Sequence, residues 1–320
     1  MRDWPAELTK ADLVEGLSRG WGLDVETVDY LPVGAGSYHW SAAADGRRWF
    51  VTVDEVSGEG RFDALDRALA TAVALRDLDF VVAPVAGLTG AVTRRLTGRH
   101  AMSVHPFVDG TAGPFGPHPP EDREPMVDLL AALHLATPTV ASIAPRTDLR
   151  LPGREGLHAA LSDAGSEWRT GPYAEPARDL LATNGARVTD WLDAFDRLVA
   201  EVRATTPTWV ITHGEPHPGN VLQTTEGRRL VDWETTLIAP PERDLWMLTS
   251  ADPGAEDLLV RYTAATGVPV SRAALDLYRL WWTLADVAAF VTDLRRPHTS
   301  GGDAADALEY LASYFPTNPH

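Results

Sequence analysis

The sequence predicts an α+β fold in two lobes, a small N-terminal lobe and a larger, mainly helical C-terminal lobe. The N-terminal lobe should be an antiparallel β-sheet with one helix, because strand and turn signals alternate over the first hundred residues. A loop rich in Gly and Pro at residues 110–120 separates this part from strongly amphipathic helical segments. We therefore expect two domains, residues 1–108 and residues 109–320.

The first lobe should be organised around a β-hairpin. Residues 27–33 have the composition of a strand and run into a glycine-rich turn, residues 34–40, which contains Gly34 and Gly36. A second strand at residues 49–53 follows the turn signal Asp45-Gly46.

Further elements of this lobe follow from apolar spacing. A short helix is expected at residues 11–22, before the first strand, and a longer helix at residues 61–78. Two more strands are expected at residues 91–95 and 101–108.

The C-terminal lobe begins with an amphipathic helix that should end near His134. Residues 138–172 are rich in Pro, Gly and Ser, so loops with short helices are expected there. Apolar residues at helical spacing then predict helices at residues 174–203, 255–265 and 272–295.

Composition excludes several classes of function. The chain has 320 residues and no cysteine, which rules out disulfides, thiolate metal sites and cysteine nucleophiles. Its net charge of −17 argues against nucleic acid or an anionic membrane as a partner. No apolar run is long enough to span a membrane, and the N-terminus has no apolar signal core, so we expect a cytoplasmic protein.

The most informative segment is His213-Gly214-Glu215-Pro216-His217-Pro218-Gly219-Asn220, which follows a short apolar strand. The prolines and the glycine prevent regular structure, so Glu215 and Asn220 should lie on a fixed loop. Phosphotransferases of the kinase type use this order of residues: a carboxylate that faces the substrate hydroxyl, then an Asn that binds magnesium. Glu215 could accept the hydroxyl proton or orient the hydroxyl.

A second segment, Leu230-Val231-Asp232-Trp233-Glu234, completes this pattern. Residues 221–222 and 230–231 should pair as a hairpin through the turn at residues 225–227, which brings Asn220 and Asp232 close together. Carboxylate and amide oxygens are ligands that suit Mg²⁺, and the ion would bridge the phosphates of a nucleotide.

Together these segments resemble the aminoglycoside phosphotransferase family, whose members share a two-lobed protein-kinase-like fold. The family's catalytic loop normally has the sequence H-G-D-x-x-x-x-N, and its metal strand is roughly I-D-[WFY]-[DE]. The resemblance extends over nearly the whole chain. It includes residues 129–134 as the first C-lobe helix, residues 102–107 as the strand before the hinge, and Pro241-Glu242-Arg243-Asp244-Leu245 after the metal strand.

The resemblance implies roles for further residues. Gly34, Gly36 and Ser37 would cover the nucleotide phosphates, and Tyr38 would pack there or contact the nucleotide. Backbone groups near His105 and Phe107 would hold the adenine ring. His213 would brace the catalytic loop through its own hydrogen bonds, and the Asp of the 241–245 segment would support the same loop.

The sequence departs from the family pattern at two positions. Glu215 stands where the family has Asp, and its extra methylene moves the carboxylate. Thr52 stands at the place of the N-lobe lysine that neutralises the α- and β-phosphates, and Lys10, the only lysine of the chain, precedes the whole sheet. We hypothesise that an arginine replaces that lysine, and the candidates are Arg48, Arg67 and Arg76.

The acceptor site is less defined by the sequence. The helix predicted at residues 272–295 carries a polar stripe that includes Asp286, next to apolar positions that include Trp282. This pattern is also typical of a core helix with a solvated face. In the functional interpretation, Asp286 and Glu234 face the cleft and bind amines or hydroxyls, with Trp282 beside them.

We therefore expect a magnesium-dependent phosphotransferase that moves the γ-phosphoryl group of ATP or GTP to a hydroxyl of a small polar acceptor. Aminoglycosides and aminocyclitols are one acceptor class, and choline-like and sugar-like hydroxyls stay open. The departures at Glu215 and Thr52 motivate an alternative, a pseudokinase that acts as a binding or scaffold protein, but the intact Asn220 and Asp232 argue against it. A third possibility is a kinase fold that binds nucleotide and transfers another group.

Overall fold

The computed structural model describes residues 1–5, 7–34, 36–58, 60–205, 208–249 and 254–316. The chain forms two compact units. The first contains Met1, residues 3–147 and residues 208–270, and the second contains Arg2, residues 148–207 and residues 271–320. The lobe boundary predicted after Val108 stays a prediction. Within the described residues, no helix is long and apolar enough to cross a membrane.

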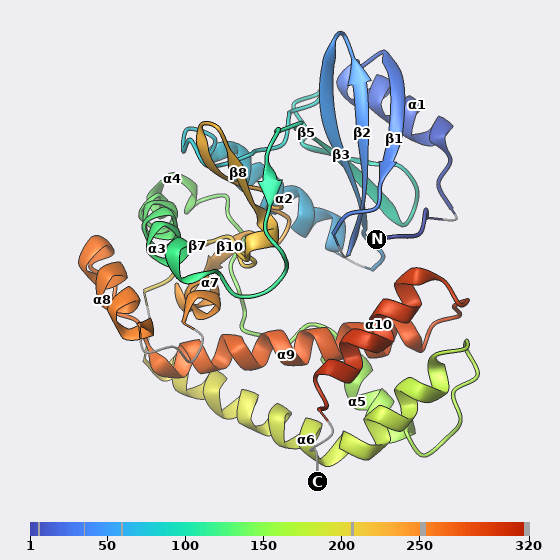
Figure 1. Ribbon diagram of the computed structural model, residues 1–320, viewed down its shortest axis with the longest axis vertical. Coiled ribbons are helices and arrows are strands. Elements are labelled where there is room, and N and C mark those ends of the chain that lie inside the picture. The colour runs from blue at the N-terminus through green and yellow to red at the C-terminus, as the bar shows by residue number, and fades with distance from the viewer. Residues whose placement is uncertain (6, 35, 59, 206–207, 250–253, 317–320) are drawn as a thin grey trace. The chain divides into compact units, whose positions relative to one another are not determined.

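The first unit contains a five-stranded antiparallel sheet in the order β1-β2-β3-β5-β4 (Figure 1). This sheet confirms the predicted α+β class with an N-terminal antiparallel sheet. Among the described residues of the expected glycine-rich turn, Gly34 and Gly36 stay outside strands and residues 37–40 belong to β2, because Trp40, Ala42 and Ala44 alternate into the core. The strands are β1 (Val25–Leu31), β2 (Ser37–Ala44), β3 (Arg47–Glu55), β4 (Thr93–Arg95) and β5 (His100–Pro106).

Two helices belong to this sheet, α1 (Lys10–Trp21) and α2 (Arg61–Ala74). Thr9 begins α1 with a capping box that it shares with Asp12, so the helix starts one residue before the predicted start at residue 11. Apolar side chains of α1 pack against one face of the sheet and form a core from Leu13, Leu17, Trp40, Val51, Val53, Met102 and Val104. The other face of β2, β3 and β5 is therefore left for polar residues.

The remainder of the first unit surrounds two small sheets, one in the order β6-β8-β9 and one formed by β10 and β7. The hairpin predicted after Asn220 is present as β8 and β9, and Val221 pairs with Leu230. The short strands β6 and β10 were not expected, because each has at most three residues. The elements are α3 (Pro120–Leu135), α4 (Thr137–Val140), β6 (Thr111–Ala112), β7 (Val210–Thr212), η1 (Pro218–Asn220), β8 (Val221–Thr224), β9 (Gly227–Leu230), β10 (Leu237–Ala239), α7 (Glu242–Leu245), η2 (Trp246–Leu248) and α8 (Ala255–Thr266).

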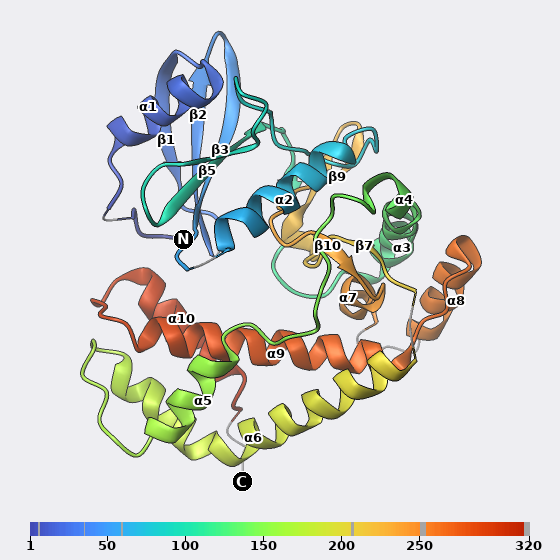
Figure 2. The same cartoon turned by 180° about the vertical axis from the view of Figure 1, so that it is seen from behind.

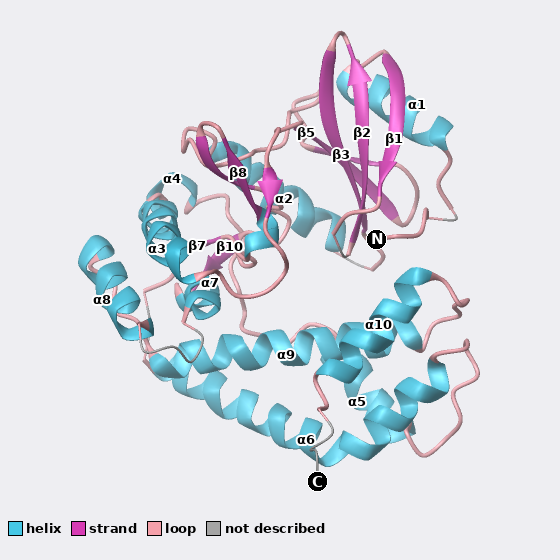
Figure 3. Ribbon diagram, viewed as in Figure 1, coloured by secondary structure: helices cyan, strands magenta, loops and turns pink. Residues whose placement is uncertain are grey.

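In its described residues, the second unit is built from helices without strands (Figure 3). The long helices α6 and α9 lie side by side, as Figures 1 and 2 both show. Buried side chains such as Leu181, Val188, Leu284 and Val291 form the core of this unit. The helices are α5 (Arg154–Asp163), α6 (Ala174–Ala204), α9 (Arg272–Leu294) and α10 (Gly302–Ser313), and only α10 was not predicted.

Candidate active site

The loop that carries Glu215 connects β7 to η1 and is fixed by its own backbone contacts. The side-chain amide of Asn220 donates to the carbonyl of Glu215 over 3.0 Å. The backbone N–H of Glu215 donates to Nδ1 of His213 over 3.2 Å. Gly214 has φ +103°, a conformation that other residues rarely adopt, and an added Cβ would collide with the guanidinium of Arg243. The loop therefore requires glycine at this position.

His213 is fully buried and uses both of its ring nitrogens within this region. Nε2 donates to the carbonyl of Val231 over 2.8 Å, which leaves Nδ1 as the acceptor for the Glu215 N–H. Burial lowers the pKa of His213, so the ring is neutral near pH 7 and keeps this tautomer. The ring thus joins the catalytic loop to the residue before Asp232.

The buried carboxylate of Asp244 supports the same loop. Asp244 of α7 accepts backbone N–H groups of His213 over 2.9 Å and of Gly214 over 2.6 Å. Nε2 of His134 in α3 donates to Asp244 over 3.0 Å, and the hydroxyl of Tyr262 in α8 lies 2.7 Å from Nδ1 of the same ring. Burial alone would raise the pKa of Asp244, but the His134 hydrogen bond and nearby positive charges outweigh it and lower this pKa.

The predicted metal pair is brought together by the hairpin. The N–H of Val231 donates to the carbonyl of Asn220 over 3.0 Å. Val231 thus faces Asn220 across the hairpin, and Asp232 is the next residue along the chain. Asp232 has φ +69°, an uncommon conformation for a residue other than glycine, and this conformation turns the chain at the end of β9. The amide nitrogen of Asn220 is held by Glu215, and its amide oxygen accepts no hydrogen bond from the described residues.

These oxygen donors suit a hard cation. Among the residues that the structure describes, no group of three or more His, Asp or Glu side chains is arranged as a complete metal site. An ion held by Asn220 and Asp232 would therefore take its remaining ligands from water and from the phosphates of a nucleotide.

Asp232 belongs to a larger group of carboxylates, which the sequence did not reveal. Glu234 follows it by two residues, and Asp54 reaches the same place from β3. Burial raises the pKa of Glu234 well above its usual range, and the charges of Asp232, Asp54 and Glu215 raise it further. Such a cluster attracts cations strongly.

Asp54 is only 8% exposed, and burial, reinforced by the charge of Asp232, raises its pKa to about 6. Its Oδ1 accepts the hydroxyl of Ser37 over 2.6 Å. Its Oδ2 meets no hydrogen-bond donor in the described parts of the chain except the Glu234 carboxyl, which donates only when protonated. Alternation along β3 could have shown that Asp54 shares a face with Thr52, but not what lies opposite.

The predicted phosphate-covering turn lies next to Asp54. Gly34 and Gly36 have φ +70° and +89°, so both use conformations that favour glycine. Ser37 begins β2 opposite Asp54 in the strand register. Tyr38 points to the opposite face and packs against the hydrophobic core, so the structure does not bring it together with Ser37.

Thr52 lies in a polar row across three strands, between His39 of β2 and Ser103 of β5. The hydroxyl of Thr52 lies 3.3 Å from Nδ1 of His39. Burial lowers the pKa of His39 to about 4, so this ring is neutral near pH 7. The row therefore contains no positive charge at the place of the expected lysine.

The two residues predicted to flank adenine lie at the end of β5 and just after it. His105 pairs with Phe50 across the sheet, and its Nε2 lies 3.1 Å from the hydroxyl of Ser103. Burial lowers the pKa of His105 to about 4, so this ring is also neutral near pH 7. The ring of Phe107 is covered by the guanidinium of Arg48 at 4.0 Å.

Of the three arginines proposed to replace the lysine, two are already engaged. Arg48 forms an ion pair with Asp109 over 2.5 Å. Arg67 donates to the carbonyl of Asp63 in its own helix over 3.3 Å. Arg76 is exposed, just after the end of α2. The replacement by any of these three stays a prediction.

The remaining acceptor candidates belong to the second unit. Asp286 and Trp282 both lie on α9, one turn apart. The hydroxyl of Tyr314 donates to Asp286 over 2.5 Å, and burial raises the pKa of this carboxyl. Their contact with an acceptor stays a prediction.

Comparison with known proteins identifies a family and similar folds. The model of the phosphotransferase enzyme family, APH, matches residues 30–281. Protein StrN of Streptomyces griseus is 30% identical over 251 residues, which are 74% of this chain and 72% of that protein.

Two solved structures are similar over nearly their full length. Spectinomycin phosphotransferase APH(9)-Ia, in complex with ADP and spectinomycin, superposes with a TM-score of 0.73 at 18% identity, over 98% of this chain and 96% of that chain. Choline kinase LicA from Streptococcus pneumoniae has a TM-score of 0.60 at 14% identity, over 95% of this chain and 98% of that chain. At these identities the likeness shows the fold.

Proposed function

Because this chain belongs to the phosphotransferase enzyme family, we propose that it transfers the γ-phosphoryl group of ATP or GTP to a hydroxyl of a small polar acceptor. The observation that carries the proposal is the convergence of Glu215, Asn220 and Asp232 on two adjoining turns of the first unit. Phosphoryl transfer depends on positioning and on charge neutralisation, and these three residues supply groups for both.

We assign Asn220 and Asp232 as ligands of Mg²⁺. A bound Mg²⁺ would neutralise charge on the β- and γ-phosphates during transfer. The Asn220 side chain also fixes the backbone of Glu215, so one hydrogen bond positions both the proposed metal ligand Asn220 and the acid Glu215. Ser37 and the turn around Gly34 and Gly36 would cover the phosphates.

Glu215 is the group that we assign to the acceptor hydroxyl. In the proposed step the hydroxyl oxygen forms a bond to the γ-phosphorus, the bond from phosphorus to the bridging oxygen breaks, and the nucleoside diphosphate leaves. Glu215 accepts the hydroxyl proton or holds the hydroxyl in line for attack. The brace through Asp244 keeps the loop from moving away during this step.

We infer an acceptor that carries amino groups, such as an aminocyclitol or aminoglycoside. Glu234 is the carboxyl group of the first unit that we assign to an ammonium group, and the net charge of −17 favours cationic molecules near the protein. The likeness to the fold of a spectinomycin phosphotransferase supports the same class. Choline-like acceptors are the second class, supported by the likeness to a choline kinase fold.

The test is a transfer assay with γ-³²P-labelled ATP or GTP, Mg²⁺ and a panel of aminocyclitols, aminoglycosides, choline and neutral sugars. The proposal expects label on an amino-containing acceptor with the wild-type chain and none with Asp232→Asn. Transfer only to neutral sugars would contradict the acceptor class. Transfer to no acceptor, with intact nucleotide binding, would favour a kinase-shaped binding protein.

A further inference from the structure

By the family pattern, β3 should present a lysine toward the phosphates, but its charged residue at the end of that face is Asp54. Thr52 occupies the place expected for lysine, and Asp54 follows two residues later on the same face of β3. Asp54 is held against Ser37 of the glycine-rich turn and has one oxygen without a hydrogen-bond donor other than a protonated Glu234. Phosphates that approach this turn therefore need a cation from another element.

Arg61, the first residue of α2, is placed to be that cation. It comes seven residues after Asp54, and it follows Gly60, whose φ of +77° turns the chain into the helix. Its side chain is exposed, and Cδ lies beside the backbone of Gly58. No hydrogen bond or ion pair to Arg61 exists within the described residues, yet its positive charge acts on the Asp54 carboxyl and lowers that group's pKa.

Helix α2, which begins with Arg61, is anchored to the sheet by two of its other side chains. Asp66 of α2 accepts the hydroxyl of Thr93 in β4 over 2.5 Å. The guanidinium of Arg95 lies 4.2 Å from the centre of the Phe62 ring. The start of α2 is thereby held near the end of β3, where Asp54 lies opposite Ser37.

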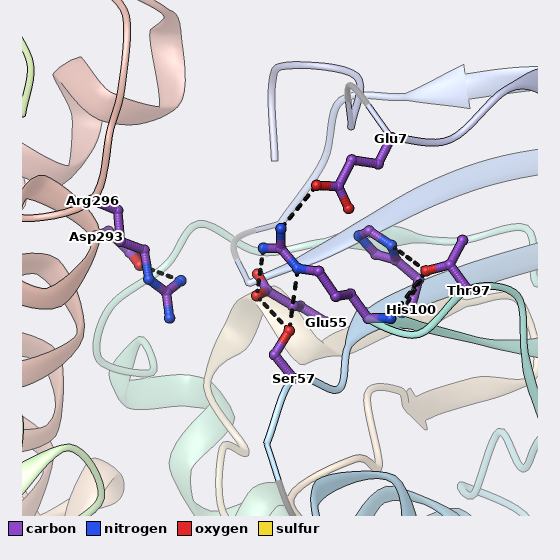
Figure 4. Close-up of polar contacts among 8 residues, drawn as sticks. Glu7, Glu55, Ser57, Thr97, His100, Asp293 and Arg296 are labelled. Carbon is purple, nitrogen blue, oxygen red and sulfur yellow. Dashed lines mark hydrogen bonds and ion pairs between the residues drawn. The ribbon is translucent and has the colours of Figure 1, made fainter.

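The other arginines near this edge of the sheet are engaged elsewhere. Arg99 binds Glu7 over 2.8 Å and Glu55 over 3.0 Å, as the network around Glu55 and Ser57 in Figure 4 shows. Glu55 follows Asp54 directly and so points to the opposite face of the strand. Arg48 lies six residues before Asp54, about 20 Å away along an extended strand.

We propose that Arg61 contacts the outer phosphates of the bound nucleotide, with Asp54 orienting its guanidinium, and so replaces the missing strand lysine. In kinases a strand lysine pairs with a helix glutamate. Here the strand carries the acid, Asp54, and the helix carries the cation, Arg61, so the signs of the two charges are reversed. This inference rests on the proposed phosphotransferase function.

Isothermal titration calorimetry with ATP and with AMP, both in the presence of Mg²⁺, tests this assignment. AMP lacks the β- and γ-phosphates, so its binding reports whether the rest of the nucleotide site is intact. Arg61→Gln should weaken ATP binding about 10- to 100-fold, because a charge-assisted hydrogen bond is lost, and should leave AMP binding unchanged. Arg61→Lys should retain part of the ATP affinity, and Arg19→Gln, an exposed arginine of α1 that pairs with Glu15, should bind both nucleotides as wild type does.

Two results would overturn the assignment of Arg61. One is unchanged ATP binding by Arg61→Gln, and the other is an equal loss of ATP and AMP binding, which indicates a distorted site. Failure of the wild-type chain to bind either nucleotide would instead reject the proposed function, and the role of Arg61 with it.

Discussion

Glu215 differs from the family's aspartate by one methylene, and the structure shows how its backbone is held despite this change. The N–H and the carbonyl of Glu215 are both fixed, by His213 and Asn220, so the longer side chain alone decides where the carboxylate lies. A displacement of this size at a reacting centre is large enough to select a different acceptor geometry.

Glu215→Gln should lower kcat for phosphoryl transfer about 10²- to 10⁴-fold, the usual effect of removing a positioned acid–base group. The KM for nucleotide should stay close to the wild-type value, because the amide still fills the same space. Steady-state kinetics measure both quantities. Glu226→Gln, in the exposed turn between β8 and β9, is the matched control. An unchanged kcat for Glu215→Gln would remove Glu215 from the mechanism.

Asp54 should make stability depend on pH in a defined direction. Its pKa in the folded chain is about 6, above the ordinary value of 3.8, so the folded state binds this proton more tightly than the unfolded chain does. Acidification from pH 7 toward pH 4 therefore relieves a destabilisation that is fully present above pH 6.

Asp54→Asn should consequently raise the free energy of unfolding at pH 8 by about 1–3 kcal/mol, and the gain should vanish near pH 4. Urea denaturation at both pH values, with EDTA and without nucleotide, measures the difference. The exposed Asp190→Asn in α6 controls for the general effect of a lost charge. A gain that is equal at both pH values would show that Asp54 is not the titrating group.

At the scale of elements, the catalytic loop depends on three helices that are distant in the sequence. Asp244 of α7 holds the loop backbone, His134 of α3 holds Asp244, and Tyr262 of α8 holds His134. All three side chains are buried, so each lost hydrogen bond would leave a polar atom without water.

Tyr262→Phe should therefore lower the free energy of unfolding by about 1–3 kcal/mol. It should also lower kcat more than it raises the KM for nucleotide, because the loop loses its alignment while Asn220 and Asp232 remain. Denaturation and steady-state kinetics measure the two effects. Tyr310→Phe, on the exposed side of α10, is the control, and equal effects of the two substitutions would contradict the brace.

Gly214→Ala tests the geometry of the loop directly. The added Cβ would meet the Arg243 guanidinium, and φ +103° is strained for alanine, so we expect a loss of about 2–4 kcal/mol in stability. Gly267→Ala is the matched control. Gly267 also has a positive φ, +73°, but no atom lies within 4 Å of the added Cβ, so its loss should be about 1 kcal/mol. Equal losses would show that the contact with Arg243 is not tight.

Many of the elements could be predicted from the sequence, because long amphipathic helices and apolar strands carry strong periodic signals. Helix α6 and the hairpin of β8 and β9 are examples. The first half of strand β2 was assigned to a turn, since two glycines precede it, and its small residues carry little periodicity. The helix α10 begins with Gly302 and Asp303 and has no side-chain cap, so its start was not recognised.

Glu215, Asn220 and Asp232 could be proposed as site residues from the sequence because they are close in the chain and follow a known order. Asp54 and Arg61 could not be proposed in this way. Their proposed role depends on how β2, β3 and α2 come together in space, which no local sequence pattern encodes. Tyr38 shows the reverse case. It is adjacent to Ser37, but alternation along the strand directs it into the core.

At the scale of the whole molecule, most of the proposed machinery lies within the first unit. The glycine-rich turn, the strand with Thr52 and Asp54, the catalytic loop and the metal pair all belong to residues 3–147 and 208–270. The chain has a net charge of −17 and Thr52 in place of the strand lysine, so nucleotide binding should depend on added divalent metal more than in a lysine-bearing site.

The most direct test of a magnesium-nucleotide site at Asn220 and Asp232 is calorimetric titration of the wild-type chain and Asp232→Asn with ATP and with GTP, with and without Mg²⁺. We expect the wild-type chain to bind at least one nucleotide only when Mg²⁺ is present, and Asp232→Asn to lose that dependence together with most of the affinity. Binding that is equally tight without Mg²⁺, or unchanged in Asp232→Asn, would contradict the site.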